Sequence, residues 1–85
     1  MLHKFNEIMK ITIYTTAYCP FCKKAKTFLE KQSFHYQEKD VEIDHQAAQE
    51  MMEKSQQTGV PVLDIAGKIV VGFNPKKIEE LLKEV

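Results

Sequence analysis

Two cysteines separated by two residues are the part of this sequence best suited to chemistry. They stand in the run Cys19-Pro20-Phe21-Cys22, and the 85-residue chain contains no other cysteine. A disulfide over two intervening residues restricts little of the unfolded chain, so stabilising the fold is not its expected role. In a reducing compartment this spacing indicates either a thiol pair that cycles or half of a metal site.

The location of the pair, between an expected strand and an expected helix, predicts different roles for the two sulfurs. Backbone N–H groups at a helix N-terminus carry partial positive charge and stabilise a thiolate more than a thiol. We therefore expect the pKa of Cys19 to lie below its usual value of about 8.5, within the range of about 3.5 to 7.5 found in such motifs. Cys22 follows three residues later on the same helix face, close enough to bond. Cys19 is the predicted nucleophile and Cys22 the predicted resolving thiol.

Two other interpretations of the pair are open at this point. The cysteines can serve as small apolar residues in a helix. A zinc site needs four ligands, but the chain has no second cysteine pair, and His3, His35 and His45 do not show ligand spacing. We expect these histidines at the surface and no metal ligands within one chain. A zinc ion shared between two chains is the remaining metal hypothesis.

Composition and charge narrow the class of protein. The length fits a single domain over residues 1–85, with residues 1–9 as an N-terminal extension that is either a frayed tail or part of a strand. Twelve Lys and Arg balance twelve Asp and Glu, which argues against a generic nucleic-acid binder. No apolar run approaches the roughly 20 residues that cross a bilayer, and residues 1–7 lack the apolar region of a secretion signal. We expect a cytoplasmic monomer that binds neither nucleic acid nor membrane.

Strand and helix patterns alternate along the chain. β-branched and aromatic residues predict strands over residues 11–15, 34–39, 62–65 and 68–71. Apolar residues at helical spacing predict helices over 19–31, 44–56 and 74–85, with Asp44 and Asn74 as N-caps. The residues expected to face the core from these helices are Phe21, Ala25, Phe28 and Leu29, then Ala47, Ala48, Met51 and Met52, then Ile78, Leu81, Leu82 and Val85. The order βαβαββα predicts a parallel opening unit and an antiparallel closing hairpin.

Three segments of the chain resemble the signatures of glutaredoxins. They are residues 13–26 around the cysteines, the run Gly59-Val60-Pro61-Val62-Leu63, and the run Val71-Gly72-Phe73-Asn74. The resemblance covers residues 10–82 and implies an α/β thioredoxin-like fold, with a four-stranded mixed sheet and three helices. It implies a dithiol oxidoreductase that reduces protein or low-molecular-weight disulfides without a tightly bound cofactor. The alternative, known for some glutaredoxins, is a module in which two chains hold an iron–sulfur cluster.

The resemblance also implies a substrate-binding surface beside the nucleophile. In the family a cis peptide bond precedes the signature proline, here Val60–Pro61, and the backbone at this turn pairs with an extended substrate. The expected substrate-binding residues are Tyr18, Pro20, Phe21, Gln57, Val60, Pro61, Gly72, Phe73 and Asn74.

Departures from the family pattern bear on the electron donor, which we expect to be glutathione or thioredoxin reductase. Thr16 and Thr58 stand where many glutaredoxins carry basic residues, and the acidic residues of the third signature are missing. These changes weaken the case for glutathione, although Gln57 and the N–H groups of the last helix are candidates for binding a carboxylate. The stretch 72–75 is similar to the glutaredoxin-like hydrogen donors of ribonucleotide reductase, which take electrons from thioredoxin reductase. The absence of these charged residues favours thioredoxin reductase over glutathione as the electron donor.

Overall fold

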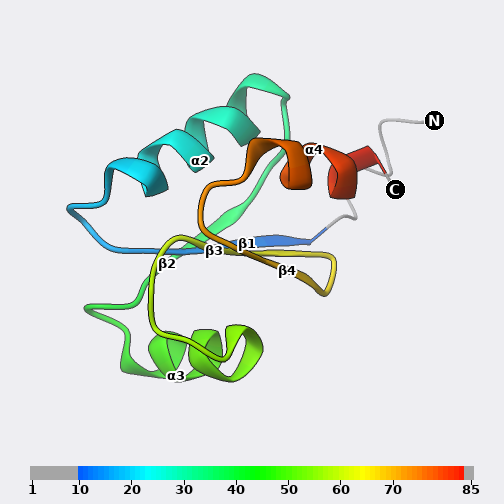
Figure 1. Ribbon diagram of the computed structural model, residues 1–85. Helices are drawn as coiled ribbons and strands as arrows, with labels where there is room; N and C mark the ends of the chain where they lie inside the picture. Colours follow the sequence, from blue (N-terminus) through cyan, green and yellow to red (C-terminus); the bar gives the residue numbers. More distant parts are fainter. Residues whose placement is uncertain (1–9, 84–85) are drawn as a thin grey trace.

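A four-stranded mixed sheet with helices on both faces forms the fold, which is described over residues 10–83 in a computed structural model (Figure 1). The elements are β1 (Ile11–Thr15), α2 (Pro20–Lys31), β2 (Gln37–Asp40), α3 (His45–Ser55), β3 (Val62–Ile65), β4 (Lys68–Val71) and α4 (Pro75–Lys83). The strand order is β2-β1-β3-β4, with β1 and β2 parallel and the other pairs antiparallel. The predicted order, parallel opening unit and closing hairpin are therefore confirmed. Residues 1–9 and Val85 lie outside the described part of the chain.

Helices α2 and α4 cover one face of the sheet and α3 covers the other (Figure 1). Because both faces are covered, all five residues of β1 are buried, including its two threonines. The core on the α2 and α4 side contains Ile11, Ile13, Ala25, Leu29, Leu63, Ile65, Val70, Ile78, Leu81 and Leu82. The core on the α3 side contains Tyr14, Ala47, Met51 and Val62. Strand β1 thus lies at the centre of the molecule and ends where the cysteine loop begins.

The second strand starts later than predicted. It begins at Gln37, whereas the sequence pattern indicated a start at Phe34. The backbone N–H of Phe34 donates to the carbonyl of Leu29 at 3.1 Å, and Ser33 has a positive φ of 64°, so this segment closes α2. Phe34 and Tyr36 pack against the core instead of extending the sheet. Their apolar character therefore reflects packing and not strand pairing.

Two residues predicted to face the core are exposed. Met52 is 46% exposed and Phe21 is 56% exposed. Each stands next to a buried residue, Met51 or Cys22, and one position along an α-helix is a rotation of about 100°. The buried stripes of α2 and α3 are therefore narrower than the predicted ones.

The predicted N-caps are confirmed. The Asp44 side chain accepts a hydrogen bond from the Ala47 N–H at 3.0 Å, and the Asn74 side chain accepts one from the Lys77 N–H at 3.1 Å. Both bonds satisfy donors that the first helical turn leaves unpaired. No helix within residues 10–83 combines the length and apolar character needed to cross a membrane.

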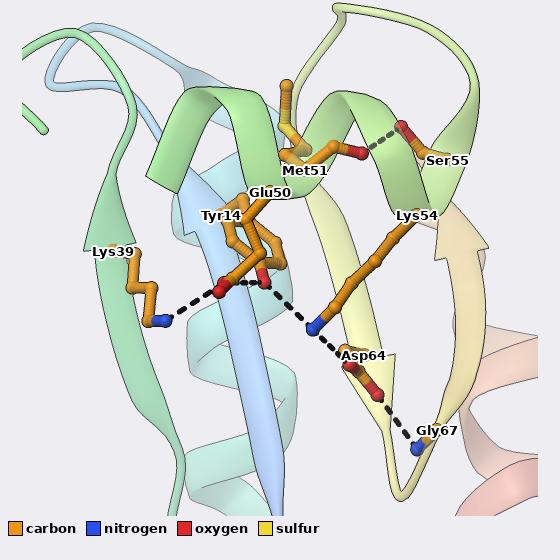
Figure 2. Close-up of polar contacts among 8 residues, drawn as sticks. All are labelled: Tyr14, Lys39, Glu50, Met51, Lys54, Ser55, Asp64 and Gly67. Atoms are coloured by element: carbon orange, nitrogen blue, oxygen red, sulfur yellow. Dashed lines mark hydrogen bonds and ion pairs between the residues drawn. The ribbon is translucent and has the colours of Figure 1, made fainter. Parts of the chain in front are cut away.

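A polar network fastens α3 to the sheet (Figure 2). The buried Tyr14 hydroxyl on β1 donates to Glu50 of α3 and accepts from Lys54 Nζ at 3.1 Å. Lys39 of β2 pairs with Glu50 at 2.9 Å, and Lys54 pairs with Asp64 of β3 at 2.7 Å. Burial, followed by the bond to Glu50, raises the pKa of Tyr14, while the bonds from Tyr14 and Lys39 lower the pKa of Glu50. The network joins three strands to one helix.

Candidate active site

Cys19 is the N-cap of α2. Its backbone is extended, with φ −131° and ψ 102°, and its Sγ accepts a hydrogen bond from the Cys22 N–H at 3.1 Å. Pro20 occupies the start of the helix, where its missing N–H leaves no bond unmade. The carbonyl of Cys19 accepts from the Lys23 N–H at 3.2 Å, which begins the helical ladder. The sulfur of Cys19 therefore occupies the place that a Ser or Asp oxygen takes in an ordinary cap.

The two cysteine sulfurs are bonded as a disulfide. Their Cα atoms lie 5.2 Å apart, within the usual range for disulfides. Cys22 is 1% exposed and Cys19 is 9% exposed. A shallow hollow of about 280 Å³ includes Cys19 and not Cys22 in its lining, which consists of Ala17, Tyr18, Cys19, Pro20 and Lys23. Cys19 is therefore the more accessible cysteine of the pair.

Two aromatic side chains close to Cys19 in the sequence are exposed, and one of them, Tyr18, lines this hollow. Tyr18 is 95% exposed and Phe21 is 56% exposed. The ammonium group of Lys24 lies 5.2 Å from the centre of the Phe21 ring, a cation–π contact. Large exposed apolar groups are typical of binding surfaces, so Tyr18 and Phe21 suit the substrate-binding role expected of them.

The second and third signature segments contact each other through a backbone hydrogen bond. The Val60–Pro61 peptide bond is cis, as the family resemblance implied. The Gly72 N–H donates to the Pro61 carbonyl at 2.7 Å, and Gly72 has a positive φ of 82°, which suits glycine. Val60 packs against the core under α3. The structure therefore brings these three predicted residues together.

Three other predicted binding residues have local partners. The Gln57 side-chain amide donates to Ser55 Oγ and to the Gly59 carbonyl, and its oxygen accepts from the Gly59 N–H. Asn74 uses its side-chain oxygen as the cap of α4. Phe73 is half-buried against Phe28, with the two rings edge to face and their centres 6.0 Å apart. The roles of Gln57, Phe73 and Asn74 in binding stay predictions.

Sequence reasoning missed a carboxylate beneath α2. The buried hydroxyl of Thr15, at the end of β1, donates to Glu38 Oε2 at 2.7 Å. Lys26 of α2 pairs with the same oxygen at 3.0 Å. Glu38 thus connects the strand that precedes the cysteine loop to the helix that follows it. The only sequence signal was that Lys26 follows Cys22 by four residues and so shares its helix face.

Replacing Glu38 with glutamine is expected to flatten the pH dependence of stability below pH 5. The hydrogen bond from Thr15, then that from Lys26, lowers the pKa of Glu38 from its ordinary 4.5. The charged form therefore contributes stability above pH 4.5, which is lost as the pH falls through the lower folded value. Because the side chain is 40% exposed, the loss is below about 1 kcal/mol. Urea unfolding at a series of pH values measures it.

The matched control for this experiment is Glu79→Gln on the exposed side of α4. It is expected to keep the wild-type pH profile. An equally steep profile in the wild type and in Glu38→Gln would contradict the role given to Glu38.

Metal ligands are not grouped in this part of the protein. Among residues 10–83, no three His, Cys, Asp or Glu side chains are placed together to hold an ion. His35 and His45 are exposed, and His3 lies outside the described residues. The hypothesis of an ion shared between two chains is untested.

Comparisons with known proteins agree with this geometry. The glutaredoxin family model matches residues 11–70. A glutaredoxin-like 8.6 kDa protein in the rubredoxin operon of Clostridium pasteurianum is 40% identical over 74 residues, covering 87% of this chain and 99% of that protein. The crystal structure of the thioredoxin-like protein BC3987 is 32% identical and covers 84% of this chain and 97% of that one, with a TM-score of 0.80.

A further solved structure is NrdH-redoxin from Escherichia coli, described as a glutaredoxin-like protein with a thioredoxin-like activity profile. It is 29% identical and covers 86% of this chain and 95% of that one, with a TM-score of 0.78. The match to the family model extends over most of the chain and includes the cysteine pair and the cis-proline turn. This chain belongs to the glutaredoxin family.

Proposed function

We propose that this protein is a dithiol oxidoreductase that reduces protein or low-molecular-weight disulfides. One observation carries the proposal: the Cys19 sulfur caps α2 and accepts the Cys22 N–H, with Cys22 within bonding reach. In the reduced protein the same N–H and the positive end of the helix favour a thiolate at Cys19. A thiolate is both the attacking form of a thiol and a good leaving group.

The reaction runs in two exchange steps. The Cys19 thiolate attacks one sulfur of the substrate disulfide, forms a mixed disulfide with it, and releases the other sulfur as a thiolate that takes up a proton. Cys22 then loses its proton and attacks Cys19 Sγ, which releases the second substrate sulfur as a thiol. Two electrons pass to the substrate, and the Cys19–Cys22 disulfide remains. An external reductant must reopen it.

Thioredoxin reductase is the proposed donor in preference to glutathione. Thr16 and Thr58 are uncharged where many glutaredoxins carry cations, and the side chains of Gln57 and Asn74 already have local hydrogen-bond partners. A tripeptide with two carboxylates thus meets few free polar groups at the positions where the family holds it. We place the protein in a reducing compartment such as the cytoplasm, because there the cysteine pair can be returned to its dithiol form.

Turnover of bis(2-hydroxyethyl) disulfide, followed as NADPH oxidation, tests both the oxidoreductase activity and the choice of electron donor. One arm contains thioredoxin reductase, and the other contains glutathione with glutathione reductase. We expect the arm with thioredoxin reductase to be the faster after subtraction of the protein-free rate. No turnover in either arm would contradict the oxidoreductase function. Faster turnover with glutathione would overturn the choice of donor alone.

A further inference from the structure

A groove runs along one side of α2, where that helix meets the segment that precedes α4. It has a volume of about 350 Å³ and is lined by Lys23, Lys24, Thr27, Phe28, Lys31 and Phe73. Lys23, Thr27 and Lys31 are spaced four residues apart and so follow one side of the helix. At 1.5 Å per residue, the distance from Lys23 to Lys31 along the helix axis is about 12 Å. This is the length of about four residues of extended peptide.

The floor of the groove is apolar and its rim is basic. Phe28 and Phe73 are half-buried, and their edge-to-face contact closes the floor between α2 and the segment that precedes α4. The described lining contains three lysines and no acidic residue. The groove therefore carries a local excess of positive charge, because the whole chain has no net charge. The acids Glu50 and Glu53 line a separate hollow on α3, on the opposite face of the sheet.

The groove lies next to the hollow at Cys19. Lys23 lines both the groove and the hollow at Cys19, so the two cavities adjoin at that side chain. A chain whose cysteine is bonded to Cys19 can therefore continue along α2 over Phe28. The aromatic floor suits a large apolar side chain, and the lysines suit carboxylates on either side of it.

We propose that this groove binds an acidic peptide segment, carrying one large apolar side chain, that flanks the reacting cysteine of a protein disulfide. The inference rests on the oxidoreductase function and adds a substrate class to it. The lysines attract such a segment and fix its direction along α2, whereas a small disulfide engages Cys19 alone. Preference for acidic partners is thus built into the helix that carries the cysteines.

Reduction of matched peptide disulfides by the reduced wild-type protein tests this. Each peptide has one cysteine, a phenylalanine and three residues of Glu, Gln or Lys, with the cysteine at either end, and is bonded to 2-mercaptoethanol. At low ionic strength we expect the Glu peptide to react about tenfold faster than the Gln peptide, and the Lys peptide to react slowest. The advantage is expected to shrink above about 0.1 M salt, where exposed charges are screened.

Lys31→Gln is the diagnostic variant because it lies far from the cysteines at the end of α2. It should lower the ratio of the Glu-peptide rate to the Gln-peptide rate about two- to threefold. Lys10→Gln is the matched control: Lys10 is also exposed, but it lines a cavity on the α3 side of the sheet. That variant should keep the wild-type ratio.

The outcomes separate this inference from the function on which it rests. If bis(2-hydroxyethyl) disulfide and all peptides stay oxidised, the oxidoreductase function itself fails. If that small disulfide is reduced but the three peptides react at equal rates, only the groove's role is overturned. Sedimentation velocity with and without salt tests whether a second copy of this chain, and not a substrate peptide, occupies the groove. A salt-sensitive dimer that Lys31→Gln dissociates would assign the groove to a second copy of this chain instead.

Discussion

Replacing Cys19 with serine is expected to abolish disulfide reduction, with a loss of at least about 1000-fold in rate. A serine hydroxyl stays protonated at neutral pH, so the N–H of residue 22 has no anion to stabilise and the first exchange step is lost. The hydroxyl can still cap α2, because serine is a favoured N-cap residue. Stability should therefore change little while activity disappears. Turnover of bis(2-hydroxyethyl) disulfide, alongside urea unfolding of both proteins in their reduced forms, measures the two effects.

The Cys22→Ser variant is the matched control, since it removes the other sulfur of the pair. It should still attack through Cys19 but lack the thiol that completes the reaction, so a mixed disulfide with the substrate accumulates. Intact mass spectrometry detects this as one added substrate thiol per chain. Substantial activity in Cys19→Ser, or trapping of the adduct on residue 22, would reverse the assignment of nucleophile and resolving thiol.

The parts of the fold that sequence predicted well depend on neighbours within one or two turns. Asp44 and Asn74 cap helices through residues only three positions away. The same holds for Cys19, whose sulfur meets an N–H three residues on. The alternation of strands and helices, and hence the topology, follows from equally local patterns of apolar residues. These features can therefore be predicted without knowledge of the tertiary structure.

The misassigned positions are those where distant packing decides the outcome. Phe34 is an aromatic residue of the type that is common in strands. Its side chain instead packs against the core under α2 and α4, and β2 begins only at Gln37. The contact of Thr15 with Glu38 spans 23 positions and depends on the register between β1 and β2. Likewise, the groove on α2 is completed by Phe73, whose ring meets that of Phe28, a residue far away in the sequence. No local pattern encodes such contacts.

The substrate-binding surface shows the same division. Tyr18 and Pro20 adjoin Cys19 in the chain and line its hollow in space. The Gln57 side chain was expected to be able to bind a carboxylate, but in the folded chain it forms hydrogen bonds with the nearby backbone of Gly59. The Asn74 side chain, expected both to cap the last helix and to contact substrate, bonds to the Lys77 N–H as that cap. Residue type thus predicted what these side chains can bind, and the fold determined which partners they have.

The largest effect expected on stability is that of Tyr14→Ala. Tyr14 is fully buried in the core beneath α3, and its ring packs with Ala47 and Met51. Truncating a buried aromatic residue to alanine costs about 3–5 kcal/mol, because the cavity that remains is only partly refilled. A domain of this size is stable by about 4–13 kcal/mol, so the loss is a large share of the total. Urea unfolding of the reduced proteins at neutral pH measures the difference.

Two further variants separate the ring of Tyr14 from its hydroxyl. Tyr14→Phe removes only the bonds to Glu50 and Lys54, which keep their partners Lys39 and Asp64, so its cost should be about 1–2 kcal/mol. Tyr18→Ala removes a tyrosine that is 95% exposed and should change stability by less than about 0.5 kcal/mol. Equal losses in Tyr14→Ala and Tyr14→Phe would show that the polar network, and not ring burial, holds α3 on the sheet. We expect Tyr14→Ala to lose more stability than Tyr14→Phe. The network keeps two of its ion pairs when only the hydroxyl is removed, so most of the loss in Tyr14→Ala comes from removal of the buried ring.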